Sequence, residues 1–171
     1  MAEIRPNGTD TVMCYSIDLK DRVEFKVNDP KGPHTSWARY IYGIIQEMKQ
    51  LGVDVKGFNT AFAGDVPLGA GMSSSAALES CFAFALNDLF GENKVSKWDM
   101  VLAGQATEHN YCGVKCGIMD QFASVFGQAG QLMRLDCRSR EFEYFPFHPE
   151  GYKLVLLDSK VKHELASSAY N

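Results

Sequence analysis

Residues 65–79 read DVPLGAGMSSSAALE and join a predicted strand to a predicted helix. The preceding residues, 57–63, have the pattern of a strand, and residues 76–90 are apolar on nearly every face, as in a buried helix. Glycines let backbone N–H groups turn toward a ligand, and a helix start adds unpaired N–H groups and the positive end of its dipole. The stretch therefore predicts either a phosphate-binding loop or a flexible, well-capped turn.

Two common phosphate-binding patterns do not describe this loop. A Walker A motif requires a lysine that is missing here, and a G-x-G-x-x-G motif fails because Met72 and Ser73 follow the second glycine. The hydroxyls of Ser73, Ser74 and Ser75 can cap the helix, bind phosphate oxygens or ligate a hard cation such as Mg²⁺. The residues alone leave these three roles open.

The composition is that of an ordinary globular protein. Of the 171 residues, 46% are hydrophobic and 22% are charged, and the net charge of −4 includes no basic block. We therefore expect no nucleic-acid surface, and the lack of a long apolar run or a signal-peptide core predicts no membrane contact. Five cysteines without a C-x-x-C pair indicate reduced thiols and a cytoplasmic protein.

The remaining pattern predicts a two-layer α+β domain of sheet and helices. We expect helices at 37–51, 97–111 and 119–126, with Ser96 capping the second, and strands at 12–17, 23–27, 131–137, 142–147 and 152–157. The last strand is nearly continuously apolar, which is typical of a central strand.

Three segments resemble a known enzyme superfamily. Residues 67–77, PLGAGMSSSAA, resemble the phosphate-binding motif of the GHMP small-molecule kinases. Residues 111–122, YCGVKCGIMDQF, and residues 135–139, LDCRS, are similar to the galactokinases within it. The resemblance implies that residues 1–171 form a partial N-terminal, ATP-binding domain with a ribosomal protein S5 domain 2-like fold, its sheet covered on one side by helices. It also implies phosphoryl transfer from ATP to the anomeric hydroxyl of galactose, with Mg²⁺.

The resemblance assigns nucleotide and metal contacts to particular residues. The phosphate contacts fall on Gly69, Ala70, Gly71, Met72, Ser73, Ser74 and Ser75. The Mg²⁺ ligands fall on Glu108 and on a hydroxyl of the serine run, here assigned to Ser75. From the residues alone, Glu108 is more often a solvated glutamate near a helix end.

The same resemblance assigns the sugar and adenine contacts. Asp120 takes the role of catalytic base, Gly117 lies against the sugar, and Tyr170 contacts it. Trp37 and Tyr40 flank the adenine. The residues alone favour simpler roles, since an Asp at a helix start is more often a cap and aromatic residues one turn apart are more often part of the core.

The galactokinase pattern is incomplete in this chain. The family's N-terminal sugar-binding motif and its C-terminal domain have no counterpart here. We therefore expect a fragment that is inactive alone, with sheet edges exposed by truncation that favour oligomerisation. Two alternatives remain open at this stage: an N-acetylgalactosamine kinase, and a non-catalytic regulator of the same fold that senses galactose or ATP.

Overall fold

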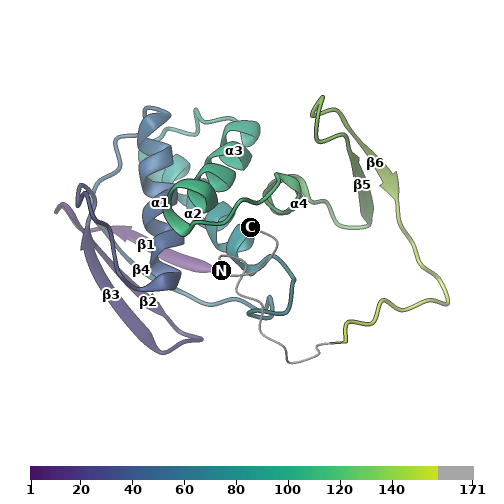
Figure 1. Ribbon diagram of the computed structural model, residues 1–171, viewed down its shortest axis with the longest axis horizontal. Coiled ribbons are helices and arrows are strands. Elements are labelled where there is room, and N and C mark those ends of the chain that lie inside the picture. Colours follow the sequence, from purple (N-terminus) through teal and green to yellow (C-terminus); the bar gives the residue numbers. More distant parts are fainter. Residues whose placement is uncertain (158–171) are drawn as a thin grey trace.

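A four-stranded sheet forms one layer of the protein (Figure 1). The structure is a computed structural model that describes residues 1–157. The strands are β1 (Ala2–Pro6), β2 (Thr11–Ser16), β3 (Asp21–Lys26) and β4 (Phe58–Phe62), in the order β1-β4-β2-β3. β2 and β4 are parallel, and the other neighbours are antiparallel. The sequence predicted β2, β3 and β4 but missed β1, a short strand that ends in proline.

Helices form the second layer and cover one face of this sheet (Figure 1). They are α1 (Ser36–Gln50), α2 (Ser74–Phe90), α3 (Lys97–Thr107) and α4 (Met119–Phe126), with a π-helical turn, η1 (Glu108–Cys112), directly after α3. The core lies between the layers, where Phe58 of β4 and Phe82 of α2 are fully buried with their ring centroids 6.3 Å apart. The predicted two-layer α+β fold is therefore confirmed.

Helix boundaries follow local signals in the sequence. Ile41, Ile44 and Met48 recur at helical spacing on α1, and all three are fully buried, as an amphipathic helix requires. Ser96 caps α3, because its side-chain oxygen accepts a hydrogen bond of 3.1 Å from the backbone N–H of Asp99. The sequence predicted a helix over 97–111, but the α-helix ends at Thr107 and a π turn completes it.

Residues after α4 form a separate hairpin of β5 (Gln131–Leu135) and β6 (Phe142–Pro146). Both strands were predicted. The hairpin packs on α4 through aromatic rings: the centroid of Phe142 lies 5.0 Å from that of Phe122 and 5.1 Å from that of Phe126. Phe142 thereby joins the hairpin to the helical layer.

The predicted central strand at 152–157 is wrong. These residues have no strand pairing, and their large apolar side chains are exposed, with Leu157 92% accessible. A central strand needs a hydrogen-bonded neighbour on each side, and no strand of residues 1–157 lies beside this segment. An apolar run of this length does not by itself distinguish a strand from other segments.

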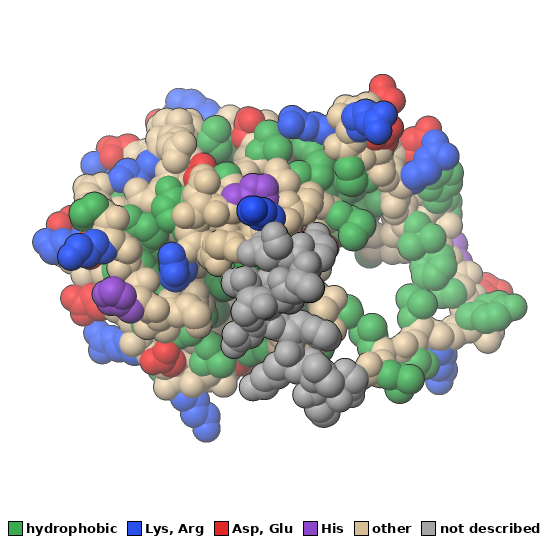
Figure 2. Space-filling model, viewed as in Figure 1, with side chains coloured by type: hydrophobic (Ala, Val, Ile, Leu, Met, Phe, Trp, Pro, Cys, Tyr) green, Lys and Arg blue, Asp and Glu red, His purple; other side chains and the backbone are tan. Residues whose placement is uncertain are grey.

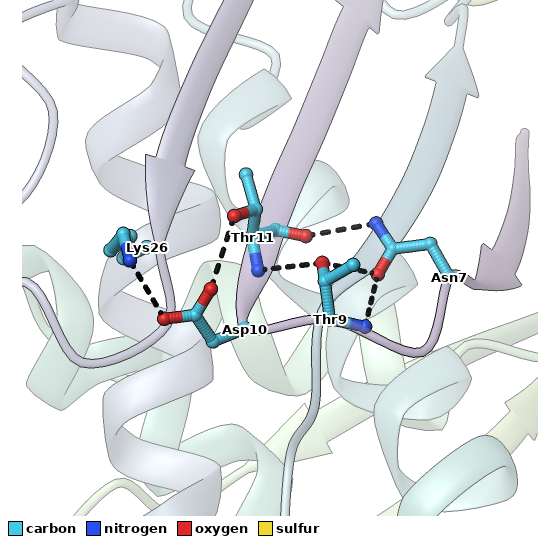
Figure 3. A network of polar contacts seen from close by, with 5 residues as sticks. All are labelled: Asn7, Thr9, Asp10, Thr11 and Lys26. Carbon is cyan, nitrogen blue, oxygen red and sulfur yellow. Dashed lines mark hydrogen bonds and ion pairs between the residues drawn. The ribbon is translucent and has the colours of Figure 1, made fainter.

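A polar network fixes the turn between β1 and β2 (Figure 3). The side-chain oxygen of Asn7 accepts a 3.0 Å hydrogen bond from the backbone N–H of Thr9, and its Nδ2 donates to the carbonyl of Thr11 at 3.0 Å. Lys26 of β3 forms an ion pair of 3.0 Å with Asp10. The network stabilises the connection between β1 and β2. These two strands do not pair with each other, since β4 lies between them.

The surface shows no concentration of one charge sign on the face seen in Figure 2, where basic and acidic side chains are intermixed. Within residues 1–157, no helix is both long enough and apolar enough to cross a bilayer.

The cysteines are free thiols that differ in exposure, which predicts selective labelling. Cys14 is 1% exposed, and burial raises the pKa of its thiol to about 12, so little of the reactive thiolate forms. Cys137 is exposed. We expect iodoacetamide at pH 8 to alkylate Cys137 in the folded protein while Cys14 reacts only after unfolding, as peptide mass spectrometry would show. Rapid labelling of both residues in the folded state would contradict this prediction.

Candidate active site

The glycine-rich loop connects β4 to α2 and turns sharply at three positions. Gly69 and Gly71 both have φ +71°, and Ser73 has φ +60°, so all three lie in the left-handed region. In the part of the chain that the structure describes, a Cβ on Gly69 or Gly71 would meet no atom within 4 Å beyond its immediate neighbours. The backbone conformation, rather than crowding by the protein, therefore accounts for these glycines, and the space beside them is open to a ligand.

Ser73 occupies the N-cap position of α2, but its side chain does not cap the helix. Its backbone carbonyl accepts a hydrogen bond of 3.0 Å from the N–H of Ala77. Of the three roles predicted for the serine hydroxyls, the Ser73 hydroxyl therefore does not have that of a helix cap. The Ser73 side chain therefore leaves N–H groups free in the first turn of α2, where the helix dipole has its positive end. Together these N–H groups and the dipole favour the binding of an anion.

Glu108 lies at the start of η1 and points inward, since it is only 3% exposed. Burial raises the pKa of its carboxyl group. A hydrogen bond with Ser75 acts in the opposite direction, and the nearby Asp120 carboxylate raises the pKa further. The alternative of a solvated glutamate is therefore excluded for Glu108, and its role as a metal ligand stays a prediction. The structure brings together three predicted site residues from α2, η1 and α4.

Asp120 is exposed in the first turn of α4. A carboxylate there is favoured by the helix dipole and remains accessible to a substrate. Gly117 precedes the helix, and a Cβ at this position would meet none of the described residues within 4 Å beyond its immediate neighbours. Packing of the protein on itself therefore does not require a glycine at 117.

The segment leading to Asp120 is tied to α3 and η1. The carbonyl of Cys116 accepts hydrogen bonds from Gln105 Nε2 at 3.1 Å and from His109 Nε2 at 2.9 Å. The N–H of Val114 donates to the carbonyl of Glu108 at 3.0 Å. These bonds fix the path of the chain between the Glu108 carboxylate and Asp120.

Trp37 and Tyr40, one turn apart on α1, have different surroundings. The indole N–H of Trp37 donates to Asp21 at 2.9 Å, and its ring lies edge-on to Phe62 at the end of β4. Tyr40 lies near the acidic residues, since burial followed by the charge of Glu108 raises its pKa. Their contact with adenine stays a prediction. Tyr170 lies outside the described residues.

A buried polar group beside the site was not anticipated from the sequence. Glu79 of α2 and Gln121 of α4 are each 1% exposed, and Gln121 Nε2 donates to Glu79 Oε2 at 3.3 Å. Burial, and secondarily the charge of Glu108, raise the pKa of Glu79 well above its usual range. The available signal was Glu79 within the largely apolar run 76–86, because a glutamate at a buried position usually has a partner.

The donor set around Glu108 fits a hard cation that is shared with a substrate. In the part of the chain that the structure describes, no group of three or more His, Cys, Asp or Glu side chains is arranged to hold a metal ion. Glu108 and the Ser75 hydroxyl nevertheless offer oxygen ligands side by side. Mg²⁺ commonly takes one or two protein carboxylates and completes its shell with phosphate and water.

Comparison with known families gives a consistent picture. Residues 39–128 match the GHMP kinases N terminal domain. The chain is 39% identical over 169 residues to galactokinase of Thermosipho africanus, covering 99% of this chain and 47% of that protein. It is 38% identical to galactokinase of Thermococcus kodakarensis over 94% of this chain and 45% of that protein. The chain spans about half the length of these relatives.

Solved structures show the same likeness. The crystal structure of Lactococcus lactis galactokinase complexed with galactose superposes with a TM-score of 0.79 at 33% identity, over 85% of this chain and 38% of that one. Methanococcus jannaschii mevalonate kinase superposes with a TM-score of 0.61 at 18% identity, over 73% of this chain and 40% of that one. The second likeness concerns the fold alone.

Proposed function

This chain belongs to the GHMP kinases, and on that premise we propose that it forms the nucleotide-binding part of a galactokinase-type sugar kinase. The whole protein would transfer the γ-phosphoryl group of ATP to the anomeric hydroxyl of galactose. The observation that carries the proposal is the convergence of Ser75, Glu108 and Asp120 beside the open glycine loop. A phosphate cradle, metal ligands and an acceptor base are the parts that phosphoryl transfer requires.

The loop 69–75 supplies the phosphate cradle in this proposal. Its left-handed turns at Gly69, Gly71 and Ser73 lead into the first turn of α2. Backbone N–H groups at such a helix start favour the phosphate oxygens of ATP. The exposed loop flanks, with Leu68 62% and Met72 40% accessible, leave room for the nucleotide.

Glu108 and Ser75 would hold Mg²⁺, which neutralises charge on the phosphates when bound. The Ser75 hydroxyl, at the start of α2, acts to lower the pKa of the buried Glu108 carboxyl group, so the two proposed oxygen ligands lie close together. Because the charge of Asp120 acts on Glu108, the proposed base would lie near the proposed metal ligands.

Asp120 would act as the base. It would accept the proton of the anomeric hydroxyl while the sugar oxygen bonds to the γ-phosphorus, and the bond from that phosphorus to the β-phosphate oxygen breaks to release ADP. Gly117 would admit the sugar close to the backbone, since residues 1–157 leave the space at its Cβ position open.

Titration calorimetry tests the nucleotide part of the proposal on this chain. We expect Mg²⁺ with a non-hydrolysable ATP analogue to bind the unsubstituted chain, and Glu108→Gln to weaken binding about tenfold, roughly 1.4 kcal/mol. The matched control is Glu92→Gln, whose exposed carboxylate forms only a surface ion pair with Lys94. Equal loss in both variants, or no loss in Glu108→Gln, would contradict the assigned metal ligand.

Titration of sugars tests the substrate class. Galactose and N-acetylgalactosamine are compared in the presence of the bound nucleotide, and ADP release is measured with the whole protein. Preference for galactose with ADP release supports the proposal. Preference for N-acetylgalactosamine would reassign the substrate, and sugar binding without ADP release would instead indicate a sensing role.

A further inference from the structure

Glu79 and Gln121 connect the two helices that carry the proposed site. Glu79 lies one turn after Ser75 on α2, so the two residues share a helix face. Gln121 follows Asp120 directly on α4. The hydrogen bond between Gln121 Nε2 and Glu79 Oε2 therefore links the metal-binding end of α2 to the helix that carries the base.

Among residues 1–157, two oxygen atoms of this pair have no hydrogen-bond partner: Oε1 of Glu79 and Oε1 of Gln121. Both are acceptors when the carboxyl group is ionised, and buried polar atoms are rarely left unpaired. A carboxylic acid that carries its proton has the donor that is missing. Glu79 could then donate to Gln121 Oε1 while it accepts from Gln121 Nε2, which satisfies both orphaned atoms with one proton.

The pair is also held in place by α3. A Cβ on Gly104 would lie 2.8 Å from Gln121 Cγ and 3.2 Å from Glu79 Oε2, so the α3 backbone packs directly against both side chains. Three helices thus enclose the pair. Little movement of either side chain is possible without disturbing the packing.

We propose that Glu79 and Gln121 form a reciprocal acid–amide pair that positions Asp120 relative to Glu108 and Ser75. This inference rests on the proposed kinase function. Glu79 and Gln121 touch no substrate in this scheme and act through their neighbours in the chain. A displacement of about 1 Å at a reacting group can cost roughly 10²-fold in rate, so a fixed α2–α4 distance has a direct catalytic consequence.

Two substitutions of Glu79 distinguish the effect of its hydrogen bonds from the effect of its side-chain volume. In Glu79→Gln, an amide makes both bonds with Gln121, so we expect kcat of the whole protein to stay within about threefold of the unsubstituted value. In Glu79→Met, the volume is similar but both bonds are lost, and we expect kcat to fall about 10²-fold with KM for Mg·ATP little changed. Equal impairment of both variants, or full activity of Glu79→Met, would overturn the inference.

A control separates positioning from stability. Asn87→Leu removes another buried polar side chain of α2, which bonds to the backbone of Val95 away from the site. We expect it to lower the urea midpoint as Glu79→Met does but to leave kcat unchanged. The double variant Glu79→Met/Gln121→Met removes both unpaired oxygen atoms of the pair, so it should regain stability without regaining kcat. Recovery of kcat in the double variant would mean that packing alone is required.

A measurement without turnover distinguishes failure of this inference from failure of the proposed function. Proton exchange of the Gln121 side-chain amide is followed by NMR in this chain. We expect slow exchange in the unsubstituted chain and in Glu79→Gln, and fast exchange in Glu79→Met. Fast exchange in the unsubstituted chain would overturn the pair itself. Slow exchange in a protein that transfers no phosphate would overturn the kinase function and the positioning role, while leaving the pair in place.

Discussion

Asp120→Asn is expected to lower kcat for galactose phosphorylation by about 10²–10⁴-fold, the usual contribution of a positioned general base. Asparagine has nearly the same shape but cannot take a proton from the sugar hydroxyl. The side chain is exposed in the first turn of α4, so the substitution should leave the free energy of unfolding almost unchanged. The rate is measured as galactose-dependent ADP release by the whole protein.

Nucleotide affinity provides the internal control for this variant. The Asp120 carboxylate raises the pKa of Glu108, so its removal lowers that pKa and keeps Glu108 ionised for Mg²⁺. Affinity for the Mg·ATP analogue should therefore be retained or increased. Asp54→Asn is the matched substitution, since Asp54 forms only an exposed ion pair with Lys56. If kcat of Asp120→Asn stayed within about threefold, Asp120 would not be the base.

The sequence predicted the elements that flank the candidate site better than the contacts between its residues. The loop at 69–75 and the helix after it were visible as a local pattern, because glycine, serine and apolar residues report directly on backbone conformation. The closeness of Glu108 to Ser75 required the fold, since the two lie on different elements. Burial of Glu108 in particular contradicted the expectation for a glutamate near a helix end.

The missed features depend on contacts between residues far apart in the chain. Glu79 finds its partner Gln121 only when α2 and α4 pack together, and no periodicity reports such a pair. The π turn η1 likewise depends on packing, because its residues have no distinct intrinsic preference. The strand predicted at 152–157 is wrong for a related reason. An apolar run indicates that a segment is buried against other residues, but it does not identify those residues or the secondary structure.

The hairpin and α4 depend on a common aromatic cluster, which explains how so short a helix is kept in place. α4 has eight residues, fewer than an isolated helix needs for stability in water. Phe122 is 2% exposed, and its ring centroid lies 4.9 Å from that of Phe126, 5.0 Å from that of Phe142 and 5.4 Å from that of Trp98. Packing of the Phe122 ring against these aromatic residues therefore stabilises α4, which is too short to be stable alone.

Phe122→Ala should accordingly reduce the free energy of unfolding by about 3–5 kcal/mol, the range for truncating a buried phenylalanine. Urea unfolding followed by circular dichroism measures the loss. Phe84→Ala on α2 is the control, because Phe84 is 40% exposed and its removal opens no comparable cavity. If the two variants lost similar stability, the aromatic cluster would not anchor α4. Phe122 lies two residues after Asp120, so the cluster that anchors α4 also supports the helix that carries the proposed base.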